Sequence, residues 1–162
     1  MPPHPWLARY PAGTPAQVDL TVYRSLLDLV DASCTRHATR PALHQGDVLI
    51  HYRELAALSR RMAAWLQHSA GLQPGERLAI MLPNLPQYLV ALIGAWRAGL
   101  VVVNVNPMYT ASEVESQLLD AGATALLTLE ALLPLVRPLR SKLGLRRIIV
   151  TVTGEMGPQG VA

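Results

Sequence analysis

The C-terminal half of the chain alternates between short apolar runs and longer segments whose apolar positions recur every three or four residues. Four runs predict β-strands: Arg77–Leu82, Leu100–Val105, Thr124–Leu129 and Ile148–Val152. Three segments between them predict helices: Pro86–Ala98, Thr110–Ala121 and Ala131–Leu143. Most of these strands are nearly continuous apolar runs, which is typical of parallel strands that helices cover on both faces. We therefore predict an α/β fold with a mostly parallel sheet wrapped by helices.

Local signals support the ends of these helices. Pro86 lies in a first turn, where its missing N–H does no harm. Thr110-Ala111-Ser112-Glu113 fits a capping box, in which threonine and glutamate each bond the other's backbone N–H. Pro134 and Pro138 interrupt the last helical segment, so we expect at least one kink there.

The N-terminal half predicts two more helices and a hairpin. An apolar stripe that includes Leu26, Val30 and Cys34 predicts a helix over Thr21–His37. Two short strands, Ala42–Gln45 and Val48–Tyr52, flank a Gly46-Asp47 turn, and a second helix follows over Arg53–Ala70. The predicted organisation is an irregular, proline-rich arm over residues 1–19, an α/β subdomain over residues 20–152 and a flexible, glycine-rich tail over residues 153–162.

Composition narrows the class of protein. The chain has 162 residues, of which 51% are hydrophobic and 15% charged, and this suits one domain with a sizeable core and excludes a disordered chain. A net charge of +3 is too small and dispersed to indicate a nucleic-acid partner. Cys34 is the sole cysteine, so no intramolecular disulfide can form, and we predict a cytoplasmic protein. The apolar stretch Tyr88–Val105 contains Arg97 and two glycines, which argues against a membrane span.

Five basic residues cluster near the C-terminus: Arg137, Arg140, Lys142, Arg146 and Arg147. Two interpretations stay open for them. One is a solvated helix face whose charges favour the helix C-terminus. The other is contact with anionic lipid heads. Binding to RNA is a poorer account, because no aromatic side chains interleave with the charges.

The sequence holds no complete catalytic, cofactor-binding or metal-binding motif. A Gly-x-Gly-x-x-Gly fingerprint and a phosphate loop ending in Gly-Lys-Ser/Thr are both absent. His44 and His51 share the predicted hairpin but lack a third ligand, and Cys34 lies on an apolar stripe that predicts an inert buried thiol. We therefore predict no catalytic, cofactor or metal residue.

Two loops follow the first two strands of the predicted sheet and are the best candidates for a site. They contain Asn84, Asn104, Asn106, Pro107 and Tyr109. Loops at the carboxyl ends of parallel strands are where open α/β sheets usually bind ligands. The functional interpretation is that these residues line a cleft or contact a further domain. The structural interpretation is that the asparagine side chains bond backbone groups and fix tight turns.

Several segments in order resemble the N-terminal region of bacterial long-chain fatty-acid–CoA ligases, which are adenylate-forming, AMP-binding enzymes. The segments are Trp6–Pro15 (WLARYPAGTP), Tyr52–Leu55 (YREL), Pro74–Asn84 (PGERLAIMLPN), Gly94–Gly99 (GAWRAG) and Val102–Thr110 (VVNVNPMYT). Relatives usually carry threonine before the Tyr-Arg-Glu-Leu segment, whereas this chain has His51, a poorer helix cap. The resemblance implies the N-terminal subdomain of the adenylate-forming ligase fold.

The resemblance also implies a function for a longer protein. The full-length family uses ATP and magnesium to convert a fatty acid to an acyl-adenylate, and coenzyme A then displaces AMP. The family's Ser/Thr/Gly-rich loop ending in Pro-Lys-Gly, a later acidic motif and a C-terminal lysine do not occur here. We therefore expect this chain alone to be inactive, to leave an apolar face uncovered, and to bind the remainder of the ligase or a second subunit. The alternative is a non-catalytic α/β module that binds a protein or membrane surface, peripherally at the inner membrane in the latter case.

Overall fold

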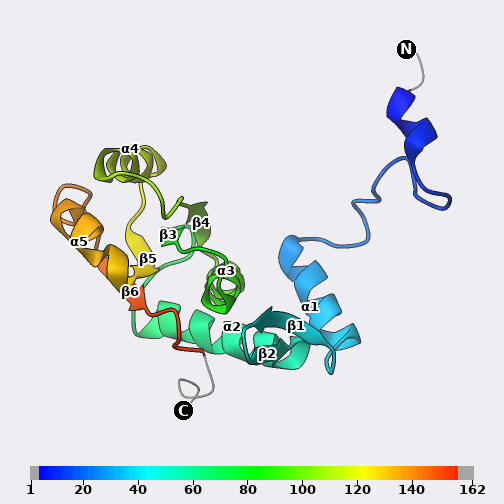
Figure 1. The fold of residues 1–162 in the computed structure, drawn as a ribbon, viewed down its shortest axis with the longest axis horizontal. Coiled ribbons are helices and arrows are strands. Elements are labelled where there is room, and N and C mark those ends of the chain that lie inside the picture. Colours follow the sequence, from blue (N-terminus) through cyan, green and yellow to red (C-terminus); the bar gives the residue numbers. More distant parts are fainter. Residues whose placement is uncertain (1–3, 157–162) are drawn as a thin grey trace.

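The computed structural model describes residues 4–156 (Figure 1). Its helices and strands are, in order, α1 (Leu26–Arg36), β1 (Pro41–Gln45), β2 (Val48–His51), α2 (Tyr52–His68), β3 (Arg77–Met81), α3 (Pro86–Arg97), β4 (Val101–Asn104), α4 (Ala111–Ala121), β5 (Ala125–Leu129), α5 (Leu133–Val136) and β6 (Arg147–Thr151). The described residues also form three short 3-10 helices, η1 (Pro5–Arg9), η2 (Glu130–Leu132) and η3 (Arg137–Leu139). No helix in this part of the chain is both long enough and apolar enough to cross a bilayer.

Four parallel strands form the central sheet in the order β4-β3-β5-β6, which confirms the predicted α/β fold. Helices α2 and α3 cover one face, and α4 and α5 cover the other (Figure 1). Successive side chains of β3 serve opposite layers, as a strand's period of two requires. Leu78 and Ile80 pack under α2 and α3, whereas Ala79 and Met81 pack toward α4. The four side chains are fully buried.

Helices α2 and α3 pack closely because of one glycine. A Cβ placed at Gly94 would lie 2.7 Å from Cγ and 2.8 Å from Cβ of Met62, and 3.2 Å from the carbonyl oxygen of Ser59. The far side of this helix pair is covered by α1 and by the β1–β2 hairpin, around a small core that includes Ile50, Leu55 and Ile93. Two layers of apolar contact therefore meet at α2 and α3.

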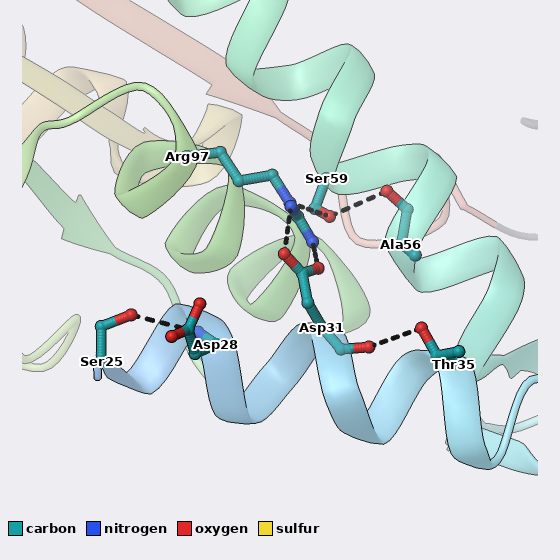
Figure 2. Close-up of polar contacts among 7 residues, drawn as sticks. All are labelled: Ser25, Asp28, Asp31, Thr35, Ala56, Ser59 and Arg97. Carbon is teal, nitrogen blue, oxygen red and sulfur yellow. Dashed lines mark hydrogen bonds and ion pairs between the residues drawn. The ribbon is translucent and has the colours of Figure 1, made fainter. Parts of the chain in front are cut away.

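Arg97, at the end of α3, links this helix to both α1 and α2 through hydrogen bonds (Figure 2). Its guanidinium binds both carboxylate oxygens of Asp31 on α1, and its Nη1 donates to Oδ2 over 3.1 Å. Its Nε donates over 3.0 Å to Oγ of the buried Ser59, which in turn donates to the carbonyl oxygen of Ala56. The hydrogen bond from Arg97 is the main cause that holds the pKa of Asp31 below its usual range. The network fixes the position of α1.

Helix α1 is shorter than predicted. The sequence pattern predicts a start at Thr21, but the helix begins at Leu26. The extended backbone of Ser25 places its Oγ to accept from the backbone N–H of Asp28 over 3.1 Å, and this N-cap ends any continuation toward the N-terminus. Upstream, Asp19 Oδ1 accepts from both the backbone and the hydroxyl of Thr21, which fixes a local turn instead of helix.

The predicted helix over Ala131–Leu143 is broken into η2, α5 and η3, followed by turns. Pro134 lies in the first turn of α5 and Pro138 in the first turn of η3. Each proline lacks the N–H that a longer helix would need and so starts a new short segment. The expected kink is therefore confirmed, but the interruption is more complete than one kink.

Helix α2 begins with half of a capping box. The backbone N–H of His51 donates to Glu54 Oε2 over 2.7 Å, and the imidazole Nδ1 lies 3.0 Å from the same oxygen. The backbone hydrogen bond is the main cause that lowers the pKa of Glu54. Glutamate thus supplies a side-chain cap at this helix start.

The N-terminal arm leaves the layered part of the molecule and extends away from it (Figure 1). Its apolar side chains are exposed, with Val18 81% and Leu20 83% accessible to solvent. Residues 1–3 of the predicted arm and residues 157–162 of the predicted tail lie outside the described residues. At the start of that tail, Glu155 accepts from the hydroxyl of Thr151 and so holds a turn at the end of β6.

Candidate functional site

The two predicted loops lie at the same edge of the sheet. Asn84 follows β3, and Asn104 ends β4, the neighbouring strand. Parallel pairing places the carboxyl ends of these strands together, as the sequence predicts. Asn84, Asn104 and Asn106 are exposed at this edge. The sheet therefore gathers the predicted residues in one region, although it does not gather them in one pocket.

Asn104 is held by a helix on each side of the sheet. Its Oδ1 accepts from the hydroxyl of Tyr88 on α3 over 2.9 Å. Its backbone carbonyl accepts from Gln117 Nε2 on α4 over 3.0 Å. These bonds join α3 and α4 across the end of β4, so Asn104 positions the loop that follows it.

Asn106 fixes a turn. Its Oδ1 accepts from the backbone N–H of Met108 over 3.0 Å, and its carbonyl accepts from the N–H of Tyr109 over 3.1 Å. Pro107 lies inside this turn, and Thr110 then caps α4 in the predicted capping box with Glu113. The backbone N–H of Thr110 is the main cause that lowers the pKa of Glu113. The contacts of Asn106 therefore agree with the structural interpretation, in which asparagine side chains bond backbone groups and fix tight turns.

Asn84 and Tyr109 face different pockets. Asn84 lines a pocket of about 310 Å³ between the β1–β2 hairpin and the start of α3, together with His44 and Leu89. Tyr109 lines a shallow pocket of about 440 Å³ over α4, together with Gln117 and Asp120. The side chains that sequence reasoning grouped therefore divide between the two sides of the sheet edge.

The topology places the ligand-binding crevice of an open sheet between β3 and β5. The helix after β3 covers one face and the helix-like segment after β5 covers the other, so the strand order reverses there. Thr128 lies near the end of β5, opposite Met81 of β3, and its buried hydroxyl has no hydrogen-bond partner among residues 4–156. Of the two predicted loops, the one containing Asn84 follows β3, a strand at which the order reverses.

A third pocket, of about 400 Å³, lies between α2, α3 and the edge strand β6. Sequence reasoning missed it. We name it the Gln87 pocket, after the polar side chain in its lining, which consists of Leu58, Arg61, Met62, Gln87, Val90, Ala91, Leu127, Ile149, Val150, Thr151, Glu155 and Met156. Most of these residues are apolar. The one sequence signal is Gln87 itself, a polar residue directly after Pro86 in a mostly apolar helix.

Cys34 and the histidines are the remaining candidates for reactive or metal-binding groups. Cys34 is buried on α1, as predicted, and burial is the main cause that raises the pKa of its thiol. Within residues 4–156, no group of three or more histidine, cysteine or acidic side chains is arranged to hold a metal ion.

The basic cluster is largely engaged within the molecule. Lys142 pairs with Glu115, and Arg146 pairs with Glu76. Arg147 Nε donates to the carbonyl oxygen of Ala70 over 3.1 Å. These residues do not form the continuous helix face that one interpretation assumed, because the segment is broken by its prolines. Two of the five basic side chains are therefore paired with carboxylates, and the interpretation as a lipid contact stays a prediction.

Comparisons with known proteins identify the family. A family profile described as AMP-binding enzyme matches residues 30–160. A long-chain-fatty-acid–CoA ligase of Yersinia pestis is 43% identical over 93% of this chain, and one of Bacillus subtilis (strain 168) is 33% identical over 95%. The match covers 27% of each of those ligases. The resemblance found from the sequence is therefore confirmed.

Solved structures agree with the fold. A long-chain-fatty-acid–CoA ligase from Archaeoglobus fulgidus superposes with a TM-score of 0.74 at 25% identity. The superposition covers 88% of this chain and 30% of that structure. Sequence and fold thus lead to the same conclusion: this chain, which spans about a quarter of the length of the curated relatives it matches, belongs to the AMP-binding enzyme family.

Proposed function

We propose that this chain is the N-terminal part of a long-chain fatty-acid–CoA ligase and that it supplies the sheet scaffold of that enzyme. The observation that carries the proposal is the 43% identity over 93% of this chain to a ligase of which the match covers 27%. The parallel sheet and its covering helices support it, since they match the fold of a ligase from the same class. The chain on its own is expected to be inactive.

The full enzyme would use ATP, magnesium, coenzyme A and a long-chain fatty acid. ATP supplies the activated phosphate that turns a carboxylate into a good acyl donor. Among the described residues, no group of three or more histidine, cysteine or acidic side chains is arranged to hold a metal ion. We therefore assign no step of the reaction to a side chain of this chain. Its role is to present the edge of the sheet to the rest of the polypeptide in the cytoplasm.

We further propose that the loops after β3 and β4 contact that remaining polypeptide or line a cleft with it. Asn84 is exposed in the loop after β3. Tyr88 holds the side chain of Asn104, and the backbone of Met108 holds that of Asn106. Together with Pro107, these two residues form a loop segment of fixed conformation. Tyr109 is half-buried and lines the separate pocket over α4.

The test is a chimera. The matching segment of the Yersinia ligase is replaced by this chain, and formation of acyl-CoA from a long-chain fatty acid is measured. We expect activity in the chimera and none from this chain alone. Calorimetry of the isolated chain with ATP and magnesium should show no binding. Tight ATP binding by the isolated chain would contradict the scaffold role, and an inactive but folded chimera would contradict membership of a working ligase.

A second candidate function is a module that binds a membrane or protein surface without catalysis. The exposed apolar residues of the N-terminal arm favour it, in particular Val18, Leu20 and Val22. Peripheral contact with the inner membrane would bury these side chains in the interface. Sedimentation with phosphatidylethanolamine–phosphatidylglycerol vesicles tests this function. Binding that is lost when the three residues become serine supports it, and no binding excludes a membrane role for the arm.

A further inference from the structure

We draw no further inference here: the strongest candidate, the shallow pocket over α4 lined by Tyr109, Glu113, Ser116, Gln117 and Asp120, carries none, because its two carboxylates are an acidic cluster on one helix and its half-buried Gln117 is not enclosed enough to indicate a ligand.

Discussion

The central strand β5 and the N-terminal arm use the same apolar residue types in opposite ways. Leu126 on β5 is fully buried between two covering layers, whereas Leu20 in the arm is 83% exposed. The chain around Leu126 has a strand on each side, β3 and β6, and helices above and below. The chain around Leu20 has no covering element among the described residues. Apolar character therefore indicates burial in a core only where the same sequence also supplies the covering surface.

The largest expected effect tests this difference directly with one substitution type. Leu126→Ala removes buried methyl groups and leaves a cavity that the sheet cannot close, so we expect a loss of about 2–5 kcal/mol in the free energy of unfolding. Leu20→Ala should change it by less than about 0.5 kcal/mol. Urea unfolding of both variants checks the pair. A loss at Leu20 comparable to that at Leu126 would show that the arm packs against the fold in solution.

The sheet could be predicted from sequence because its strands are short, apolar and separated by capped helices. Each of these signals is local, and parallel pairing follows from the alternation of strand and helix. The start of α1 was predicted five residues too early, although Ser25-Leu26-Leu27-Asp28 has the spacing of a helix cap. Val22 lies four residues before Leu26 and so fits the spacing of the apolar stripe of this helix, although it is exposed. This spacing favours an earlier start than the helix-cap signal indicates.

The candidate site was harder to predict from the sequence than the sheet. The carboxyl-edge loops follow from topology, so their shared location could be predicted. Contacts between side chains far apart in sequence could not, since no local pattern encodes them. Tyr88 meets Asn104 across 16 residues, and Gln87 meets the backbone of Val152 across 65. The second contact holds the side chain of Gln87, which lines the Gln87 pocket, and no local pattern in the sequence indicates it.

The next largest effect compares two glycines. Gly94→Ala forces a Cβ against Met62 and the backbone of Ser59, so the α2–α3 packing must open. The gain of about 1 kcal/mol in helix propensity offsets part of this strain, and we expect a net loss of about 1–3 kcal/mol. Gly13→Ala in the arm meets no atom within 4 Å, although its φ of 86° adds local strain. Thermal unfolding should show a lower Tm for the first variant alone.

A third prediction concerns the link between the two regions. Asp31→Asn leaves the largely buried Arg97 guanidinium without its carboxylate partner, and we expect a loss of about 1–2 kcal/mol. Arg24→Gln, in the exposed pair with Asp28, serves as the control and should cost less than about 0.5 kcal/mol. Equal losses in urea unfolding would mean that α1 is held by apolar packing and not by the ion pair.

The same pair sets a pH dependence with a definite sign. Arg97 lowers the pKa of Asp31 in the folded chain, so the unfolded chain binds a proton at higher pH than the folded one. The stability from this carboxylate is complete above the ordinary aspartate pKa of about 4 and is lost as pH falls through the lowered value. The stability difference between the parent chain and the Asp31→Asn variant should therefore be constant from about pH 7 to 5 and shrink below about pH 4. A difference that grows on acidification would contradict the assignment.

The smallest expected effect compares two helix caps of the same kind. Thr110 Oγ1 accepts from the N–H of Glu113 at the start of α4, and Ser25 Oγ accepts from the N–H of Asp28 at the start of α1. Replacement of either by alanine removes a bond worth about 1 kcal/mol to its helix. Helix α4 is packed on the sheet through the buried Val114, so its first turn cannot fray without cost, and the loss should appear in global unfolding.

The first turn of α1 is different because Leu26 is 62% exposed and little packing depends on it. After Ser25→Ala that turn can unfold locally, so the global free energy should fall by less than about 0.5 kcal/mol. Hydrogen exchange would then quicken at the backbone amides of Leu29 and Val30, which lose their i−4 carbonyl partners when the turn opens. If both alanine variants lower the global stability equally, the boundary between the cooperative fold and the arm lies before Ser25. If they differ as expected, that boundary lies within α1, between its exposed first turn and the Asp31–Arg97 pair.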